Sequence, residues 1–303
     1  MGLHLALGLA SVVTAAIPVS DWAIGANDPF VGAGIVATSD GIVYFVDRGR
    51  DVVWKLEDGA LDSVVVGMKT RALQLAANGA LMGISRSPRG TEAWVVREDG
   101  RVQTVARGAG QGLTVDLQGQ LYGWSAGPRR DRISVWRARQ DGRRFELAGG
   151  VSGHRDGSGD DVRFFAIGAM TMAGDGSLLL TSGASIRRVA LDGRVSTVAS
   201  GSKLLKPKSS LLRRLAGAAR AHLSGISVDG GGALYVANAE RELVARIARG
   251  KATSFYRSPR GWHPVGVAAT HHDGVYVLEY GRGVRVAFVD PQGRARPLLE
   301  LAG

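Results

Sequence analysis

Short apolar segments alternate with glycine-containing turns along most of the chain. Six times such a turn is followed directly by an apolar run, as in SDGIVYFVD, GDGSLLLTS and GGGALYVAN. The glycines of these turns are Gly41, Gly79, Gly119, Gly176, Gly232 and Gly274. Pairs such as Asp-Gly and Gly-Gly supply the positive φ angles that tight hairpins require. The apolar runs on either side are too short for helices, so they predict strands joined by hairpins.

A second set of turns has the same count and lies downstream of the first. These turns follow further apolar runs such as VVWKLEDG and RRVALDG, and their glycines are Gly59, Gly100, Gly142, Gly193, Gly250 and Gly293. A four-stranded sheet cannot bury both of its faces alone, whereas a ring of six places each sheet between two neighbours. The pattern therefore predicts an all-β fold, a six-bladed β-propeller of four-stranded antiparallel blades. A two-sheet sandwich would explain the strands but not six copies in phase.

The composition excludes several kinds of functional site, but it does not identify the binding partner. The chain has 303 residues, is 45% hydrophobic and contains no cysteine, which excludes disulfides, cysteine-ligated zinc and thiol catalysis. Its formal net charge of +11 favours anionic neighbours. Charge alone does not choose among nucleic acid, phospholipid headgroups and acidic polysaccharide.

The N-terminal segment differs from the rest of the chain. Residues 2–20 carry no formally charged side chain, and the run LALGLASVVTAA is apolar and rich in small residues. It is similar to the apolar part of a secretory signal, without the usual basic leader. We expect residues 1–20 to be a signal peptide or an N-terminal anchor, with a buried first strand as the third alternative. Residues 21–303 then form the propeller, in a periplasmic or extracellular protein.

A basic insertion interrupts the repeat at residues 203–223, KLLKPKSSLLRRLAGAARAHL. Its leucines and alanines recur at helical spacing, which predicts one short helix. The basic surface that it would form consists of Lys203, Lys206, Lys208, Arg213, Arg214 and Arg220. One interpretation is a surface helix that contacts anionic lipid or polymer. The other is a helix packed over the propeller rim, with solvated arginines.

The glycine-rich run AGGVSGHRDGSGDDVRF, residues 148–164, is the other departure from the repeat. A phosphate loop would lead into a helix, but a strand follows here. Asp156, Ser158 and Asp160 alternate like the ligands of a calcium loop, although the sharp-turn glycine and the bidentate glutamate of such a loop are both missing. We interpret the run as a connector in which Asp156 and Ser158 hold the turn, while Phe164 and Phe165 plug the space between blades.

Polar side chains are predicted to gather where the second strand of each unit ends. In a propeller, these ends and the starts of the innermost strands lie on one face, around the channel mouth. Asp47, Asn238 and Glu279 end second strands, and Arg71 and His263 enter innermost strands. We expect these five ligand-binding candidates to converge on one rim, where they could hold a polar ligand or a cation. The alternative is that each hydrogen-bonds its own turn.

Two of the units carry a family resemblance. The stretch from 148 to 199, with GDGSLLLTS, IRRVALDG and RVSTVAS, resembles an NHL repeat, and GISVDGGGALYVANAERELVARI is similar in register. The resemblance implies an NHL-like propeller in which the glycine-rich run is a connector. Some NHL-type propellers bind RNA through a basic face, so the resemblance keeps that partner open.

Gluconolactonase-type propellers are more distantly similar, in phrases such as GIVYFVD. That resemblance implies a metal-dependent hydrolase whose first glutamate belongs to a Glu-Gly-Pro motif. Here Ala33-Gly34 stands in that place, and Ser224-Gly225 replaces an expected Asp-Gly. Losing a carboxylate ligand abolishes most hard-cation sites, which counts against the lactonase interpretation.

We therefore predict an exported, monomeric, non-catalytic binding or scaffold propeller that recognises a protein or an anionic polymer. The prediction includes no catalytic residue, metal or cofactor. A membrane surface is a further partner through the basic insertion, and nucleic acid ranks last. The alternative function is a metal-dependent hydrolase or lyase of the gluconolactonase-like type, which would bring a divalent cation.

Overall fold

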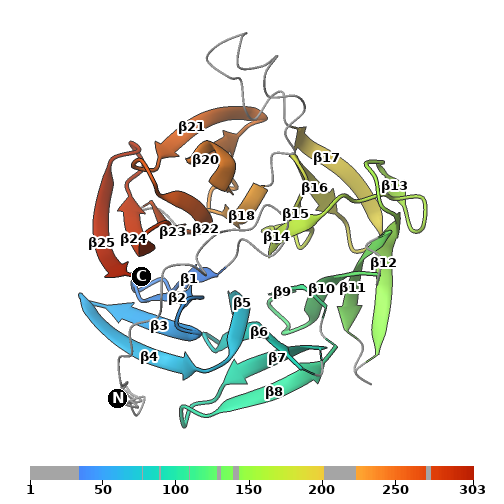
Figure 1. Ribbon diagram of the computed structural model, residues 1–303. Helices are drawn as coiled ribbons and strands as arrows, with labels where there is room; N and C mark the ends of the chain where they lie inside the picture. The colour runs from blue at the N-terminus through green and yellow to red at the C-terminus, as the bar shows by residue number, and fades with distance from the viewer. Residues whose placement is uncertain are drawn as a thin grey trace, which may run out of the picture.

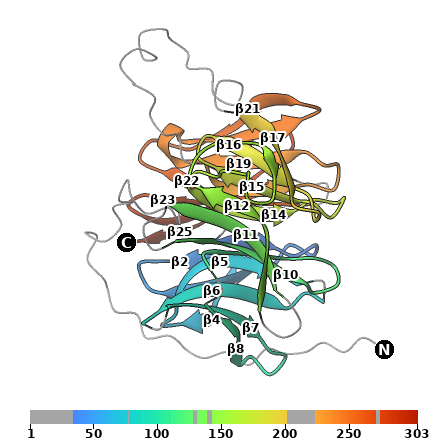
Figure 2. The ribbon, with the colours of Figure 1, turned by 90° about the vertical axis from the view of Figure 1, so that its right-hand side faces the viewer.

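The computed structural model describes residues 34–76, 78–88, 90–108, 110–127, 131–138, 143–200, 223–270 and 274–303. Within them, six antiparallel sheets surround a common axis (Figure 1). Figure 2 shows the ring from the side, with blades 1 and 2 in the lower half and blades 4 and 5 in the upper half. The predicted all-β six-bladed propeller is confirmed.

Each blade is a contiguous stretch of chain whose strands run in order from the axis outward. The first three blades consist of β1 (Ile35–Ala37), β2 (Val43–Asp47), β3 (Val52–Glu57) and β4 (Ala60–Val66), then β5 (Lys69–Leu75), β6 (Leu81–Ser87), β7 (Gly90–Val96) and β8 (Val102–Arg107), then β9 (Gly112–Val115), β10 (Leu121–Ala126), β11 (Arg132–Ala138) and β12 (Arg144–Val151).

The last three blades follow the same plan, with one extra strand. They consist of β14 (Ile167–Met172), β15 (Leu178–Ser182), β16 (Ser185–Val189) and β17 (Arg194–Ser200), then β18 (Leu223–Val228), β19 (Leu234–Asn238), β20 (Leu243–Ala248) and β21 (Lys251–Arg257), then β22 (His263–Ala269), β23 (Val275–Tyr280), β24 (Gly283–Val289) and β25 (Ala295–Ala302). The extra strand, β13 (Gly157–Ser158), pairs with β17 on the outer edge of blade 4.

The hairpins form because their sequences close tight turns. Gly232 adopts a φ of 79°, which a side chain would disfavour. The Asp229 carboxylate accepts hydrogen bonds from the backbone N–H groups of Gly231 and Ala233, at 2.9 and 2.8 Å. Asp116 and Asp290 make the same kind of turn in other blades. The turn carboxylates are therefore used locally, as Asx turns.

A β-bulge recurs between the third and fourth strands of all six blades. The register shifts fall at Val53/Trp54, Ala93/Trp94, Val135/Trp136, Ile186/Arg187, Val244/Ala245 and Val286/Ala287. A bulge adds right-handed twist and interrupts the regular ladder. Each outer strand is consequently less suited to pairing with another molecule.

The core consists of apolar layers between neighbouring blades. One cluster joins Phe45 and Trp54 of blade 1 to Val265, Leu278 and Val286 of blade 6. The second strands are buried on both faces, and every residue of β2, β15 and β19 is buried. Each blade thus depends on its neighbours for burial, as expected for a ring of sheets.

The glycine-rich connector, residues 148–164, joins blade 3 to blade 4. Arg187 of β16 is fully buried, and its guanidinium donates to Asp156 at 2.6 Å and to the backbone oxygens of Arg155 and Arg163. The backbone N–H and the hydroxyl of Thr197 also donate to Asp156. These contacts confirm the prediction that Asp156 holds the turn of the connector.

The two phenylalanines of the connector behave differently. Phe164 is fully buried beneath the Arg187 guanidinium, 5.4 Å from it, and fills the space between blades as predicted. The same expectation for Phe165 is wrong, because its side chain is 50% exposed. The two residues are neighbours in an extended segment, so their side chains point in opposite directions.

Two predicted segments lie outside the described residues. They are the N-terminal segment 1–20 and the basic insertion 203–223 with Lys203, Lys206, Lys208, Arg213, Arg214 and Arg220, of which only Leu223 is described, at the start of β18. In the described part of the chain the single helical element is the 3-10 turn η2 (Ala239–Arg241), and no helix there is long and apolar enough to cross a membrane.

Blades 1 and 6 meet without sharing a strand, because each described sheet is built from consecutive strands. Two polar contacts reinforce the apolar cluster at this seam. The Tyr280 hydroxyl donates to the backbone oxygen of Val46 at 2.8 Å, and the Arg50 guanidinium donates to the backbone oxygen of Ala302 at 2.5 Å.

Tyr280→Phe is expected to lower the free energy of unfolding by about 1–3 kcal/mol, because a buried carbonyl loses its donor. Denaturant unfolding measures this loss, and hydrogen exchange should accelerate first in blades 1 and 6. Tyr122→Phe is the matched control, since that hydroxyl bonds Asp116 inside blade 3. Equal effects of the two variants on exchange at the seam would contradict the assignment.

Candidate functional site

The five predicted ligand-binding residues lie on one face of the ring. The start of each innermost strand pairs with the end of the second strand, as in Thr70 with Ser85, Leu223 with Asn238 and His263 with Tyr280. We call this the rim face, and the face with the Asp-Gly hairpins the turn face. The side chains on the rim face nevertheless have different surroundings.

Asp47 is fully buried and hydrogen-bonds its own turn. Its carboxylate accepts from the backbone N–H groups of Gly49 and Arg50, at 3.0 and 3.1 Å. It also accepts from the Arg50 guanidinium at 2.8 Å and from the Trp54 indole at 3.4 Å. The carboxylate is therefore neutralised and largely saturated by its own blade.

Glu279 is also fully buried, between blades 5 and 6. It forms an ion pair with Arg285 at 2.7 Å and accepts a hydrogen bond from the Tyr256 hydroxyl at 3.0 Å. Burial raises the pKa of the Glu279 carboxyl, although its hydrogen bonds and the charge of Arg285 oppose that shift. Glu279 faces the neighbouring blade, where it contributes to inter-blade packing.

Asn238 caps the only helical turn in the described part of the chain. Its side-chain oxygen accepts from the backbone N–H of Arg241 at 3.0 Å, while its buried Nδ2 has no hydrogen-bond partner among the described residues. Asparagine is a preferred residue at the N-cap of a helical turn, because its side-chain oxygen can accept such a hydrogen bond. Like Asp47, Asn238 shapes the loop that leaves the second strand.

His263 is half-buried at the start of β22. Its Nδ1 lies 3.1 Å from the backbone oxygen of Ala239. A carbonyl oxygen only accepts, so this contact assigns a proton to Nδ1 and leaves Nε2 as the atom for other partners.

Two arginines of the rim face, Arg48 after β2 of blade 1 and Arg71 in β5 of blade 2, act electrostatically on Tyr280 of blade 6. The Arg48 guanidinium is 5.8 Å from the centroid of the Tyr280 ring. Burial raises the pKa of the Tyr280 hydroxyl to about 12, and the charges of Arg48 and Arg71 oppose that rise. Both cations therefore lie within electrostatic reach of one hydroxyl, and both are half-buried. Arg48 was not predicted, although it directly follows the strand-end Asp47.

In blades 1 and 2, an indole N–H donates to the polar residue near the end of the second strand. The Trp94 Nε1–H donates to the Ser85 hydroxyl at 2.7 Å, and the Trp54 Nε1–H donates to Asp47. A Cβ at Gly83 would lie 2.3 Å from the Trp94 ring, so this close packing requires glycine. A tryptophan in the third strand of each of the first three units was the available sequence signal.

The side chains that could ligate a cation do not fit the metal centre of the alternative function. No three His, Asp or Glu side chains among the described residues are close enough together to hold a metal ion. Ser224, which stands where an aspartate was expected, donates its hydroxyl to the backbone oxygens of Ala237 and Pro264.

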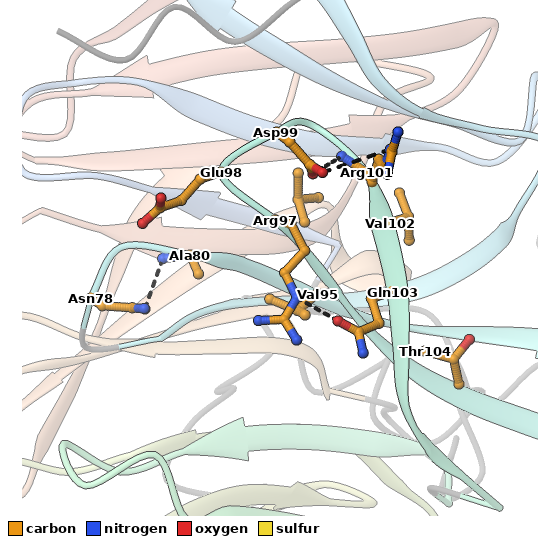
Figure 3. Close-up of a pocket in the computed structure, with 11 residues that line it drawn as sticks. Asn78, Ala80, Val95, Arg97, Glu98, Asp99, Arg101, Val102, Gln103 and Thr104 are labelled. Carbon is orange, nitrogen blue, oxygen red and sulfur yellow. Dashed lines mark hydrogen bonds and ion pairs between the residues drawn. The ribbon is translucent and has the colours of Figure 1, made fainter.

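Two hollows lie away from this cluster. A cavity of about 170 Å³ inside the channel is lined by innermost strands, including Ile35, Leu73 and Ile226. A groove of about 860 Å³ runs along the turn face of blade 2 (Figure 3). In this groove Arg97 donates to Gln103 and Arg101 pairs with Asp99, so these four side chains bind one another.

Comparisons with known proteins show the fold alone. No family model and no curated protein sequence matches the chain. A solved streptogramin B lyase is 16% identical, with a TM-score of 0.57 over 91% of this chain and 86% of its own. Virginiamycin B lyase from Staphylococcus aureus is 15% identical (TM-score 0.54, covering 89% and 85%). A gluconolactonase from Xanthomonas campestris is 18% identical (TM-score 0.55, covering 83% and 80%). The chain thus shares its six-bladed architecture with propeller enzymes.

Proposed function

We propose that the protein is a non-catalytic binding propeller that recognises an anionic partner, a protein or a polymer, at its channel mouth. The binding sector is the part of the rim face formed by blades 6, 1 and 2. The observation that carries this proposal is the unequal exposure of the charges there. Asp47 and Glu279 are fully buried and paired with Arg50 and Arg285.

The cations of the same sector are more accessible. Arg48 and Arg71 are half-buried, so they keep some contact with solvent. Partial burial lowers the local dielectric and strengthens their attraction for an anion. Guanidinium groups also match carboxylate and sulfate oxygens through paired hydrogen bonds. The expected export of the chain agrees with this proposal, because it would bring cell-surface and extracellular polyanions within reach.

The double variant Arg48→Gln/Arg71→Gln is expected to bind an anionic partner about 100-fold more weakly, because two charge-assisted contacts are lost. The measurement is titration calorimetry against polygalacturonate, a sulfated glycan, an acidic peptide and neutral dextran. Arg194→Gln/Arg296→Gln, on the turn face, removes the same charge and should bind like the parent. If no anionic probe separates the two double variants, the proposed site is wrong.

A propeller enzyme of the hydrolase or lyase type is the second candidate. It is favoured by the solved structures of similar fold, whose names identify lyases and a gluconolactonase. On this reading the Nε2 of His263 would serve as the base. The test incubates the protein with panels of lactones, esters and polyuronates and analyses the products. Turnover that disappears in His263→Asn would replace the binding proposal with the enzymatic one.

A further inference from the structure

The cavity inside the channel lies between innermost strands, in the half of the channel nearer the turn face. Its volume is about 170 Å³. The innermost strands surround the axis (Figure 1) and run from the rim face to the turn face. The lining residues lie toward their ends, as with residues 73–75 of β5 and 267–269 of β22. Arg71 and His263 belong to the first halves of the same strands, so the cavity is separate from the binding sector.

One residue of each innermost strand lies at the same level of the channel, paired with a second-strand residue shortly after the turn glycine. These six residues are Val36, Gln74, Thr114, Thr171, Ser227 and Ala268. Blades 2–5 thus place a polar side chain at this level, whereas blades 1 and 6 place an apolar one. The repeat positions are equivalent, but their chemistry differs around the ring.

The wall of the cavity accordingly has two different sides. Blades 1 and 6 contribute residues 35–37 and 267–269, all of them isoleucine, valine or alanine. Their innermost strands β1 and β22 contact each other, so these residues form one continuous apolar side. Blades 2, 4 and 5 each contribute one polar side chain, from Gln74, Thr171 and Ser227. All three are half-buried, so they keep contact with solvent.

The polar side chains of the cavity have hydrogen-bonding capacity that the described residues do not use. Ser227 Oγ accepts from the backbone N–H of Ala269 at 3.0 Å, which leaves its O–H able to donate. Gln74 Nε2 donates to the backbone oxygen of Leu75 at 3.2 Å, which leaves the amide oxygen able to accept. Among the described residues, the Thr171 hydroxyl has no hydrogen-bond partner. The polar side therefore offers both donors and acceptors.

The charge and the size of the cavity restrict what it can hold. None of the described residues that line it carries a charge, and an ion placed there would lose its hydration without gaining a counter-charge. At about 30 Å³ for each water molecule, the volume corresponds to about six waters or a molecule of about six non-hydrogen atoms. Waters against blades 1 and 6 would lack hydrogen-bond partners on that side, whereas an alkyl group would need none.

We propose that this cavity is a binding site for a small uncharged diol. Its hydroxyl groups lie toward blades 2, 4 and 5, and its alkyl part packs against blades 1 and 6. Ser227 donates to one hydroxyl, the Gln74 amide oxygen accepts from a hydroxyl, and Thr171 completes the polar side. The inference is independent of the proposed function, because it uses no residue of the binding sector.

The experiment follows the NMR methyl signals of Ile35, Met170 and Ile226, which line the cavity. Three probes of nearly equal size differ in one property each. Butanediol with vicinal hydroxyls has the alkyl edge, glycerol replaces that edge with a further hydroxyl, and lactate carries a charge. Butanediol should shift the three signals saturably, with a dissociation constant in the millimolar range. Glycerol and lactate should bind about tenfold more weakly.

Three variants test the hydrogen bonds of the site. Thr171→Val is expected to weaken butanediol binding about fivefold, because it removes one hydroxyl group at little change in size. Thr171→Ser keeps the hydroxyl and should bind butanediol like the parent. Thr104→Val, on the exposed strand β8, is the matched control and should also bind like the parent. Melting curves verify that the variants fold, and the methyl shifts of the parent test the site without any substitution.

The outcomes separate this inference from its alternatives. If no probe shifts the three methyl signals, the cavity holds water only and the inference is wrong. Lactate binding as tightly as butanediol would contradict the uncharged ligand, and equally tight glycerol binding would contradict the alkyl edge. Equal effects of Thr171→Val and Thr104→Val would place the diol outside the cavity. Arg48→Gln/Arg71→Gln should bind butanediol like the parent, so the diol site and the proposed function fail separately.

Discussion

Glu279→Gln is expected to lower the free energy of unfolding by about 3–5 kcal/mol, the cost of removing one partner from a buried ion pair. The carboxylate is fully buried and the Arg285 side chain is 9% exposed, so the guanidinium would remain buried without a counter-charge. The Tyr256 hydroxyl links this pair to blade 5, and the variant should therefore loosen the contact between blades 5 and 6. Urea unfolding gives the free energy, and hydrogen exchange locates the loss.

A double variant tests whether the loss of stability comes from the unpaired charge or from altered packing. Glu279→Leu/Arg285→Met replaces both ions with apolar side chains and should recover most of the stability, because an intact apolar pair carries no desolvation cost. Tyr256→Phe should cost less than Glu279→Gln, since it removes one neutral donor. If Glu279→Gln unfolds like the parent, the pair contributes nothing to the contact between blades.

Arg187→Met is expected to lower the free energy of unfolding by about 3 kcal/mol. The substitution keeps an unbranched apolar chain but leaves the backbone oxygens of Arg155 and Arg163 without their donor, and Asp156 without its cation. The connector between blades 3 and 4 should become accessible to protease. Arg188→Met is the matched control, because that neighbouring arginine is 41% exposed and its pair with Asp175 is a surface pair.

The effect of Arg187→Met should depend on pH. Burial alone would raise the pKa of Asp156, but the hydrogen bonds from Thr197 and the charge of Arg187 outweigh it and hold that pKa below its usual range. A carboxylate with a lowered folded pKa stabilises the fold above its unfolded pKa, about 4, and that stability is lost as the pH falls through the folded value. The difference between parent and variant should therefore shrink under acid. A difference that grows below pH 4 would contradict this assignment.

The fold was predictable because its signals are local and repeated. Turn glycines such as Gly41 and Gly232 adopt the positive φ angles that their Asp-Gly and Gly-Gly pairs predicted. Six copies of the pattern make the ring the only arrangement that buries every sheet on both faces. The shared face of the five candidate residues also followed from strand order alone.

The chemistry of the candidates was less predictable because it depends on distant partners. The sequence predicts Glu279 as a carboxylate at a strand end, yet it is buried against Tyr256 of another blade. Asp47 is neutralised by Arg50 in its own turn. Register fixes the face on which a residue lies. It does not fix whether a long side chain folds back into the space between blades. The role of the five candidate residues in ligand binding remains a prediction. Among them, Arg71 and His263 are favoured because their side chains are the more accessible to solvent.

The pairing of Lys69 with Arg86 shows another limit of the sequence pattern. Lys69 and Arg86 belong to different apolar runs, and only the pairing of β5 with β6 places them side by side. In the sequence they are two basic residues among many. A pattern of hydrophobic positions predicts strands, but like-charge neighbours appear only once the register is known.

Among the described residues, blades 1 and 6 share no strand, and this has a consequence for how such a protein can change. Every described sheet is encoded by one uninterrupted stretch of the gene, so duplication or loss of that stretch would add or remove a whole sheet without leaving an orphaned strand behind. Relatives with a different number of sheets are therefore accessible in single genetic steps.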